Sequence, residues 1–548
     1  GRAPFRASRD WLAAALRAVG TRGGLRAASC SRRDGVGRFL APGRSAYVTA
    51  DGVPFSGLFL RPNTDLLYVE WSASLVSPVG RTGRGGYAPV VTNDVLTPDL
   101  DPARLTAMKV RVAELLPTLR EDLEVLTRIP SVSLAAFDQA HVEASAEAVA
   151  GLLRAEGLDV EIVREGGRPA VLGHIDGPDG APTVMLYAHH DVQPPGAESD
   201  WDSAPFEPTE RGGRVYARGI ADDKAGVMAH IAALRVHSGA LPVGVTVFVE
   251  GEEEIGSDSL GTILERHGEK LRADAIVLAD STNWAVGEPA LTTTLRGMIR
   301  VVLTVRALDH GIHSGMFGGA VPDAITALIR IIATLHDAEG NVAVAGLRSS
   351  VASDLDYPEE RLRAESGLLD GVQTIGSGSI LSRLWTKPSI TTIGIDAPSV
   401  ATSSNTLVPQ AAAKISMRIA PDEDPKEGYR LLAEHLRASA PWGVQVDIHL
   451  DDEGAGFCAD ANGPVYDQAR EAFTDAWGVA PVDIGVGGSI PFVAAFAERF
   501  PGAGILVTGV EDPDTRAHGA NESLHLGEFE RVCLAEAVLF ERLGLLRL

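Results

Sequence analysis

From Leu100 onwards, short apolar runs alternate with stretches of helical spacing. The apolar, β-rich runs that predict strands are 160–164, 169–175, 182–189, 245–251 and 274–280. Helical spacing covers 100–129, where Pro117 marks a break or a fresh helix start, and 222–239, which ends at a glycine. Because nearly continuous apolar strands alternate with helices, we expect an α/β fold whose mostly parallel sheet is covered by helices on both faces.

A second pattern begins near residue 294 with a strongly β-branched strand over 299–307. Helices are expected over 322–337 and 425–439, and a less regular region lies over 346–389. The first pattern then resumes, so the simplest account is an α+β unit inserted into an α/β domain. The predicted division is an extension at 1–99, the main domain at 100–293, the inserted unit at 294–455 and the rest of the main domain at 456–548.

The composition is that of a globular protein with a substantial core, since 45% of the 548 residues are apolar and 22% are charged. No run of about 18 apolar residues occurs, so we expect no transmembrane helix and no membrane partner. The three cysteines, Cys30, Cys458 and Cys533, are widely spaced and form no CxxC pair. A disulfide scaffold and a cysteine zinc site are therefore not expected.

The charge is unevenly distributed along the chain. Residues 1–93 contain thirteen Arg, no Lys and five acids, a formal charge of +8, so the remaining residues carry −32 of the total of −24. A body this acidic is a poor nucleic-acid binder, because phosphate contacts need a basic surface. Clustered acids could instead hold cations. We interpret the basic start as a poorly ordered extension and assign it no function.

Histidine and acidic residues follow several of the predicted strands. His189 and Asp191 close the strand at 182–189, and in extended chain they share a face, so that Asp191 can orient the His189 ring. Asp222 opens the helix at 222–239, where a plain helix cap is the alternative interpretation. Taken alone, each of these residues is also compatible with an ordinary structural role.

Three further segments complete the set. Four acids crowd positions 250–254 just beyond a strand, Asp280 ends the strand at 274–280, and His518 follows an apolar run at 505–510. The carboxyl ends of strands in an open α/β sheet are where binding sites form. Two imidazoles with three carboxylates suit a pair of cations such as zinc, with one carboxylate bridging them.

The segments YAHHDVQP, RGIADDKAG, EGEEEIGS, IHSGMFGG, GGSIPF and AHGANE resemble, in this order, the motifs of one known enzyme family. This is the co-catalytic zinc metallopeptidase family of carnosinase-like nonspecific dipeptidases, glutamate carboxypeptidases and aminoacylases. The resemblance covers about 100–548 and is greatest to the dipeptidase branch. It implies that the inserted unit is a lid and dimerisation domain.

The resemblance also implies a role for each motif residue. The ligands of one metal would be His189, Asp222 and Asp280, and those of the other would be His518, Asp222 and Glu254. The two ions would be zinc, with manganese or cobalt as alternatives. Glu253 would be the general base and Asp191 the carboxylate behind His189. A water shared by two cations has its pKa lowered towards ~7, and a carboxylate beside it can take its proton.

Further residues would bind substrate. In the family, the histidine of the HSG motif, here His313, reaches into the partner subunit's site and stabilises the oxyanion, which implies a homodimer. Arg418 resembles the arginine that clamps the substrate's free carboxylate. Its partner is either Asn405 or Thr406, since spacing to flanking residues supports each. Gly488 and Ser489 would contribute a backbone amide and a hydroxyl near the same carboxylate.

These inferences predict a cytoplasmic, homodimeric, di-metal dipeptidase. It would cleave dipeptides or short peptides with a free C-terminal carboxylate, using a metal-bridging hydroxide and a glutamate base. One alternative is an amidase of N-acyl amino acids, because an acyl amide and a peptide bond are chemically alike. A non-catalytic peptide-binding relative is less consistent with the sequence, because such a protein should have lost ligands or the base.

Overall fold

The residues that the computed structural model describes are 37–39, 67–69, 100–488 and 491–546. The chain divides into two compact units, 1–94 and 95–548, which are described separately. In the first unit, β1 (Gly37–Phe39) pairs antiparallel with β2 (Leu67–Val69). The rest of the extension predicted over 1–99 lies outside the described residues.

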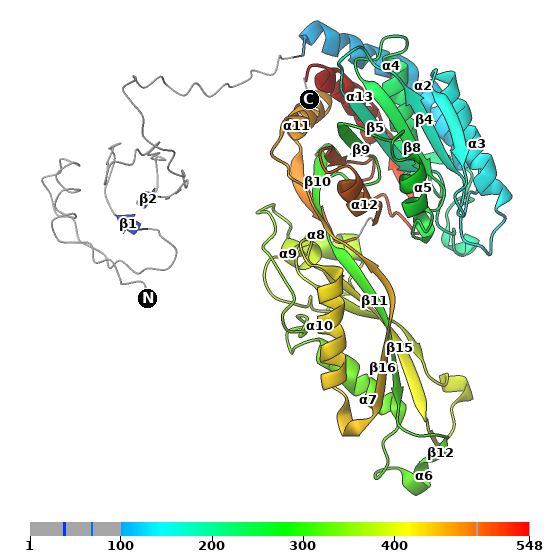
Figure 1. Cartoon of the computed structure of the whole chain (residues 1–548), viewed down its shortest axis with the longest axis vertical. Coiled ribbons are helices and arrows are strands. Elements are labelled where there is room, and N and C mark those ends of the chain that lie inside the picture. The colour runs from blue at the N-terminus through cyan, green and yellow to red at the C-terminus, as the bar shows by residue number, and fades with distance from the viewer. Residues whose placement is uncertain (1–36, 40–66, 70–99, 489–490, 547–548) are drawn as a thin grey trace, which may run out of the picture. The chain divides into compact units, whose positions relative to one another are not determined.

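Within the described part of the second unit, the central sheet has nine strands (Figure 1). They are β3 (Asp159–Val163), β4 (Ala170–Ile175), β5 (Thr183–His189), β8 (Gly244–Glu250), β9 (Ala275–Leu278), β10 (Ala290–Leu295), β17 (Phe457–Cys458), β18 (Val482–Val486) and β19 (Gly504–Val507). Their order is β17, β10, β19, β9, β5, β8, β4 and β3, and β18 also pairs with β10. The central β8, β5, β9 and β19 run parallel. On one side β4 pairs antiparallel with β8 and β3 with β4, and on the other β10 pairs antiparallel with β19 and β17 with β10. The carboxyl ends of the four central strands therefore meet at one edge.

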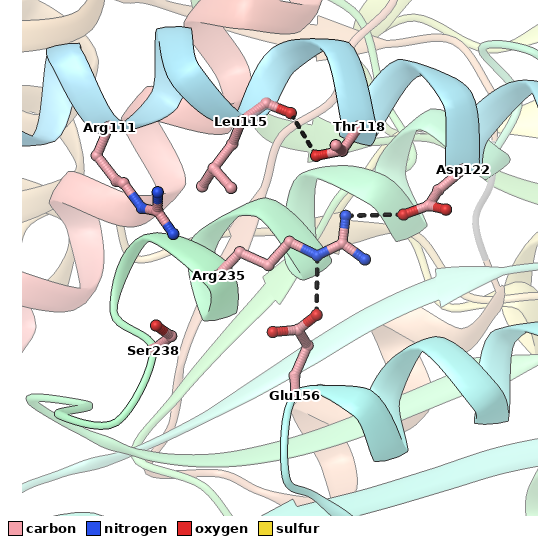
Figure 2. Close-up of a pocket in the computed structure, with 7 residues that line it drawn as sticks. All are labelled: Arg111, Leu115, Thr118, Asp122, Glu156, Arg235 and Ser238. Atoms are coloured by element: carbon pink, nitrogen blue, oxygen red, sulfur yellow. Dashed lines mark hydrogen bonds and ion pairs between the residues drawn. The ribbon is translucent and has the colours of Figure 1, made fainter.

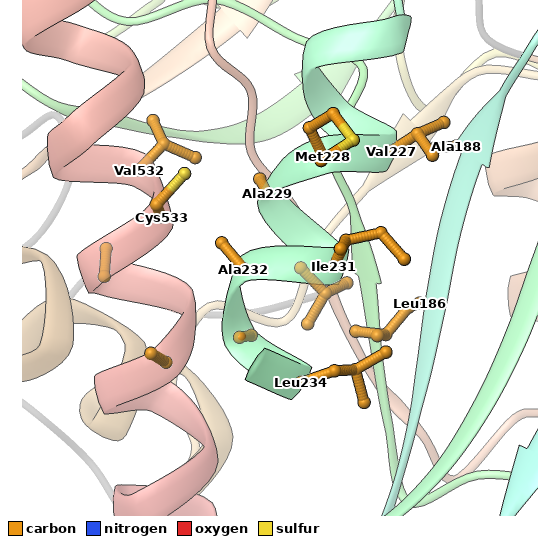
Figure 3. Packing of buried hydrophobic residues seen from close by; sticks show 14 of the residues in the cluster. Leu186, Ala188, Val227, Met228, Ala229, Ile231, Ala232, Leu234, Val532 and Cys533 are labelled. Carbon is orange, nitrogen blue, oxygen red and sulfur yellow. The ribbon is translucent and has the colours of Figure 1, made fainter. Parts of the chain in front are cut away.

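Helices cover both faces of this sheet, as the apolar runs predicted. On one face lie α2 (Pro102–Thr127), α3 (Ala140–Ala155), α4 (Lys224–Val236), α11 (Pro464–Trp477) and α13 (Leu526–Gly544), and on the other α5 (Leu260–His267) and α12 (Pro491–Arg499). Along β5, Leu186 and Ala188 face the first group, whereas Met185 and Tyr187 face the second. Figure 3 shows α4 packed between α13 and the strands of the sheet. The predicted α/β class is confirmed.

The first helix differs from its prediction at one point. Residues 102–127 form one continuous helix, and Pro117 lies inside it rather than at a break. Pro117 is exposed, as is Ala113, whose carbonyl loses the usual N–H donor one turn later and can bind water instead. Among the described helices, including α2, none is long and apolar enough to span a bilayer.

After β10 the chain leaves the central sheet, and it returns at β17. Between them a four-stranded antiparallel sheet has the order β13 (Ser389–Asp396), β15 (Gln410–Ile419), β11 (Gly297–Arg306) and β16 (Gln445–Gly454). Alternate residues of β11 are buried against α7 (Ala324–Ile332) and α10 (Pro425–Ala438). The smaller elements are β12 (Ile312–His313), α6 (Ser314–Phe317), α8 (Glu359–Ser366), α9 (Ile380–Trp385) and β14 (Thr406–Leu407).

A small three-stranded sheet lies outside the central one. It consists of β6 (Thr209–Arg211), β7 (Arg214–Tyr216) and β20 (Ser523–His525), in the order β20, β7, β6. β20 precedes α13 directly, so this sheet ties the C-terminal part of the chain to the segment before α4.

A buried charge pair joins α4 to α13. His230 Nδ1 lies 2.6 Å from a carboxylate oxygen of Glu536, and its Nε2 lies 2.9 Å from the Tyr187 carbonyl. Burial alone would lower the pKa of His230, but the charge and hydrogen bond of Glu536 outweigh burial and raise it. The imidazolium and carboxylate therefore stabilise each other within the core.

We predict that Glu536→Gln destabilises the fold by about 3–5 kcal/mol, because it leaves a buried imidazolium without its anion. Since the folded pKa of His230 is raised, the pair's contribution is full below the unfolded value of about 6.5 and is lost as pH rises through the folded value. Urea unfolding at a series of pH values measures this. The exposed Glu530→Gln on the same helix is the matched control. A cost that does not change with pH would contradict the prediction.

Candidate metal centre

The predicted ligands lie at the shared carboxyl edge of the central strands. His189 is the last residue of β5, and Asp280 lies two residues beyond β9. Glu254 lies in a short 3₁₀ turn, η2 (Glu253–Ile255), that follows β8. Asp222 lies in the turn before α4, where the Asp222–Asp223 peptide bond is cis, and His518 lies in the loop after β19 with a left-handed φ of 63°.

These five residues form two donor sets that share Asp222. In the first set, ligand atoms of His189, Asp222 and Asp280 all lie within 4.8 Å of one another, and in the second set those of Asp222, Glu254 and His518 do. One oxygen of Asp222 lies 3.1 Å from His189 Nε2, and its other oxygen lies 3.1 Å from His518 Nε2. The carboxylate therefore faces both imidazoles at once.

Asp191 lies behind the first set. Its carboxylate lies 3.4 Å from His189 Nδ1, the ring nitrogen that points away from Asp222. The same carboxylate accepts hydrogen bonds of 3.2 Å from the backbone N–H groups of Glu253 and Glu254. Asp191 thus connects the orientation of the His189 ring to the turn that carries Glu253 and Glu254.

The acidic run at 250–254 divides into two pairs. Glu250 is buried and accepts a hydrogen bond from the Tyr187 hydroxyl. Glu252 is also buried, and it accepts from the backbone N–H groups of Arg168 and Ser259. From the sequence alone, these four acids either repel one another and need cations, or lie in a turn exposed to solvent. Instead, two of the four have structural partners, which leaves Glu253 and Glu254 at the site.

Burial and mutual repulsion dominate the electrostatics of this edge. Burial raises the pKa of Asp280 to about 7, with repulsion from Asp222 in the same direction and attraction to His189 opposing it. Burial also raises the pKa of Glu253, and that of Glu254, where repulsion from Asp222 adds to it. Hydrogen bonds to Asp222 and Glu254 raise the pKa of His518 to about 11. The excess of carboxylates over imidazoles therefore favours binding of positive charge.

The donor chemistry fits two divalent cations. Each set offers one imidazole nitrogen and two carboxylates, a combination that suits zinc, manganese or cobalt. Glu254, in the second set, is held by Gln193, whose backbone N–H and side-chain amide donate to its two oxygens at 3.0 and 2.8 Å. The arrangement can therefore hold two ions close together with a shared carboxylate between them.

Arg418 lies in β15, at the end of the inserted sheet that adjoins β10. It pairs with Met298 of β11 and Ser389 of β13 and is half-buried. Arg296, just before β11, lies near enough for repulsion by Arg418 to add to burial, and together these lower the pKa of Arg296 to about 10. The guanidinium of Arg296 donates to the Gly487 carbonyl at 3.1 Å. Of the predicted carboxylate-binding residues, Arg418 therefore lies near Arg296, and Gly488 follows the glycine that Arg296 contacts. Ser489 lies outside the described residues.

His313, Asn405 and Thr406 form a separate group. His313 pairs with Thr406 between β12 and β14, and the Asn405 carbonyl accepts from the Ser314 N–H at 2.9 Å. Figure 1 shows β12 and α6 at the end of the inserted sheet remote from the central one. The ten residues of β11 separate the two ends by about 30 Å. The structure thus does not bring these three residues to the donor sets of the same chain.

Several residues near the site were not singled out by the sequence analysis. Asp223 occupies the N-cap position of α4, but its side chain makes no cap hydrogen bond and instead accepts from the His189 N–H at 3.2 Å. Glu511 lies in a bridge with Thr282 beyond the ends of β19 and β9, and burial together with repulsion from Asp222 raises its pKa. Glu522, four residues after His518, is fully buried. Gln193 and Glu522 lie within quoted motifs, so their positions could have been noticed from sequence.

A hollow of about 340 Å³ lies between α2 and the C-terminal end of α4, at the end opposite Asp222 (Figure 2). Arg235, one of its lining residues, lies 2.8 Å from Asp122 and 2.8 Å from Glu156. Its charge is therefore compensated by the protein, and the hollow presents no unmatched charge at that residue to a ligand.

Residues 185–541 match peptidase family M20/M25/M40. The chain belongs to this family. It is 37% identical over 364 residues, 65% of this chain and 80% of the relative, to a cysteinylglycine-S-conjugate dipeptidase of Corynebacterium striatum. Among solved structures, human carnosine dipeptidase 1 has a TM-score of 0.70 at 23% identity, covering 82% of this chain and 100% of that one. The dipeptidase Dug1p from Saccharomyces cerevisiae has a TM-score of 0.69 at 24% identity, covering 80% and 98%.

The membership confirms the resemblance predicted from the motifs, including its dipeptidase branch. It also confirms the enzyme class, since the matched family is a peptidase family and its relatives include proteins named metallodipeptidases. The family match begins within β5 and ends within α13, so it spans all five residues of the two donor sets.

We predict that the metal-free protein binds two divalent cations per chain. Because Asp222 belongs to both sets, Asp222→Ala should abolish tight binding of both, whereas His518→Ala should leave one tight site. Equilibrium dialysis against Zn²⁺ or Mn²⁺ with elemental analysis measures the stoichiometry. The exposed His174→Ala is the control. If Asp222→Ala still bound two cations, the shared-carboxylate arrangement would be wrong.

Proposed function

We propose that this M20 family member hydrolyses the peptide bond of dipeptides or short peptides with a free C-terminal carboxylate. The observation that carries the proposal is the pair of donor sets joined by Asp222, with Glu253 in the turn beside them. Dipeptidase names among the relatives support this substrate class. A cytoplasmic location is part of the proposal and agrees with the free thiols of Cys458 and Cys533.

In this proposal His189, Asp222 and Asp280 hold one ion, and Asp222, Glu254 and His518 hold the other. Zinc is the expected metal, with manganese and cobalt as alternatives. When bound, two such cations lower the pKa of a water between them and polarise the scissile carbonyl. Asp191 keeps the His189 ring in one orientation by lying 3.4 Å from its Nδ1.

Glu253 is the proposed general base. Its backbone is fixed by the Asp191 carboxylate, and its side chain is largely buried, which raises its pKa. A raised pKa strengthens the affinity of a carboxylate for a proton, which suits a group that must take one. Glu253 would take a proton from the attacking water and deliver it to the leaving amine nitrogen.

Arg418, Gly488 and Ser489 are the proposed binding residues for the substrate's free carboxylate. Arg418 supplies a planar fork of donors, which suits two carboxylate oxygens. Arg418 is half-buried, and its repulsion of the nearby Arg296 supports binding of an anion beside the two guanidinium groups. Recognition of a terminal carboxylate favours short substrates.

We further propose that the enzyme is a homodimer whose inserted unit, 294–455, acts as lid and dimerisation domain between 100–293 and 456–548. His313 would stabilise the oxyanion in the partner's site. Asn405 or Thr406, the predicted partner of Arg418 in carboxylate binding, would enter the partner's site together with His313, because all three residues lie together. A distance of about 30 Å along β11 argues against action within one chain. The edge strand β13 exposes Ile393 and Ile395 by 53% and 55%, which suits pairing with a second copy.

The proposed activity predicts hydrolysis of dipeptides with a free carboxylate and much slower hydrolysis of N-acetyl amino acids. A panel containing both classes, assayed with the zinc- or manganese-loaded enzyme, measures the difference. Glu253→Gln should lower kcat by at least about 10²–10⁴-fold while two cations stay bound. Preference for N-acetyl amino acids would instead favour the amidase alternative, and near-normal turnover by Glu253→Gln would contradict the base assignment.

Action in trans predicts complementation between two inactive variants. His313→Ala and Glu253→Gln should each be nearly inactive as homodimers, whereas a heterodimer of the two contains one intact site. Heterodimers isolated with two different affinity tags should recover about half of the wild-type turnover per dimer. The exposed His310→Ala is the matched control and should keep full activity. Absence of recovery in properly formed heterodimers would count against a shared site.

A further inference from the structure

The loop that carries Asp222 surrounds a second carboxylate, that of the fully buried Glu522. One oxygen of Glu522 accepts from Arg218 Nη1 at 2.6 Å and from the Gly219 N–H at 3.1 Å. The other oxygen accepts from the N–H groups of Ala221 at 3.1 Å and Asp222 at 3.3 Å. Four donors from residues 218–222 therefore converge on a single side chain.

This convergence determines where the Asp222 backbone lies. Residues 218–222 belong to no strand and precede α4, so strand pairing does not hold them. Backbone N–H groups that are buried need acceptors, and charged acceptors bind them more strongly than neutral ones. Glu522 is the acceptor for three such groups in this loop, including the N–H of Asp222 itself.

The same side chain connects Asp222 to the segment of His518. Glu522 lies four residues after His518, and its backbone carbonyl accepts from the Ala217 N–H at 3.1 Å. Arg218, its ion-pair partner, also donates to the Gly519 carbonyl at 3.1 Å. Glu522 and Arg218 thus hold the loop of the shared carboxylate and the loop of one imidazole at a fixed separation.

We propose that Glu522 is a positioning residue for the second donor set: it keeps Asp222 at the distance from His518 that binding of the second cation requires. This inference rests on the proposed metal centre and adds a requirement to it. The side chain of Glu522 does not contribute a ligand atom to either set.

The test compares two substitutions of buried carboxylates on one segment. Glu522→Gln keeps the size of the side chain but replaces an acceptor oxygen with an amide that faces donors. The control is Asp512→Asn, whose carboxylate pairs with Arg214 at 3.1 and 2.9 Å and is equally buried. Asp512 bonds to Arg214 of β7 and to the N–H of Asp514 rather than to residues 218–222.

Binding of Zn²⁺ to the full-length metal-free protein is followed by equilibrium dialysis, and thermal unfolding of the metal-free proteins is recorded alongside. Glu522→Gln should bind the second cation about 10- to 100-fold more weakly, whereas Asp512→Asn should bind both as the wild type does. Both variants should lose thermal stability. If Glu522→Gln does not fold, Glu522→Asp replaces it, because the shorter carboxylate cannot reach both Arg218 and the N–H of Asp222.

Unchanged affinity in the Glu522 variant, or an equal loss in Asp512→Asn, would overturn the inference while leaving the metal centre intact. A wild-type chain that binds no second cation would overturn the metal centre itself, and with it this inference. The two failures are therefore distinguished by the wild-type measurement alone.

Discussion

The carboxylate of Asp222 lies between two imidazoles, and its two contacts of 3.1 Å join the two donor sets into one site. Such a group is costly to bury because it is desolvated beside other acids. Its pKa nevertheless lies below the usual value, since hydrogen bonds to His189 and His518 outweigh the effect of burial. The surrounding structure supplies these partners from elements that are far apart in sequence, and the rest of the site is organised around them.

The parallel centre of the sheet is what makes this meeting possible. In β5, β8, β9 and β19 the chain runs in one direction, so each strand ends at the same edge and delivers its following residues there. The antiparallel edge strands extend the sheet without adding ligands. Around the ligands, hydrogen bonds hold individual atoms in place: the Asp191 backbone carbonyl bonds the His189 ring, Gln193 the Glu254 carboxylate, and Asp223 the His189 backbone. A loosely held site would not keep five donors converged.

The inserted unit shows the opposite arrangement, in which predicted substrate-binding residues lie far apart. Its long antiparallel strands carry His313 and Thr406 away from the donor sets while Arg418 stays at the near end, beside Arg296. A single chain therefore carries the predicted substrate-binding residues at two opposite ends of the inserted sheet, Arg418 at the end that adjoins β10 and His313 and Thr406 at the other. This geometry is the physical basis for proposing that two copies complete each other's sites.

The sequence by itself determined most strands and helices and the residues of the two donor sets as candidates, because local periodicity and motif spacing depend only on neighbouring residues. His189, Asp222, Glu254, Asp280 and His518 are all recognisable from their places at the ends of predicted strands and helices. The interior position of Pro117 is not, because residues on both sides of it are buried in the same core, which offsets the cost of the missing hydrogen bond. Only the tertiary structure decided that Glu250 and Glu252 turn to structural partners, that His313 lies far from the ligands, and that Glu522 holds the Asp222 loop. Each of these depends on contacts between segments distant in the chain, which no local pattern encodes.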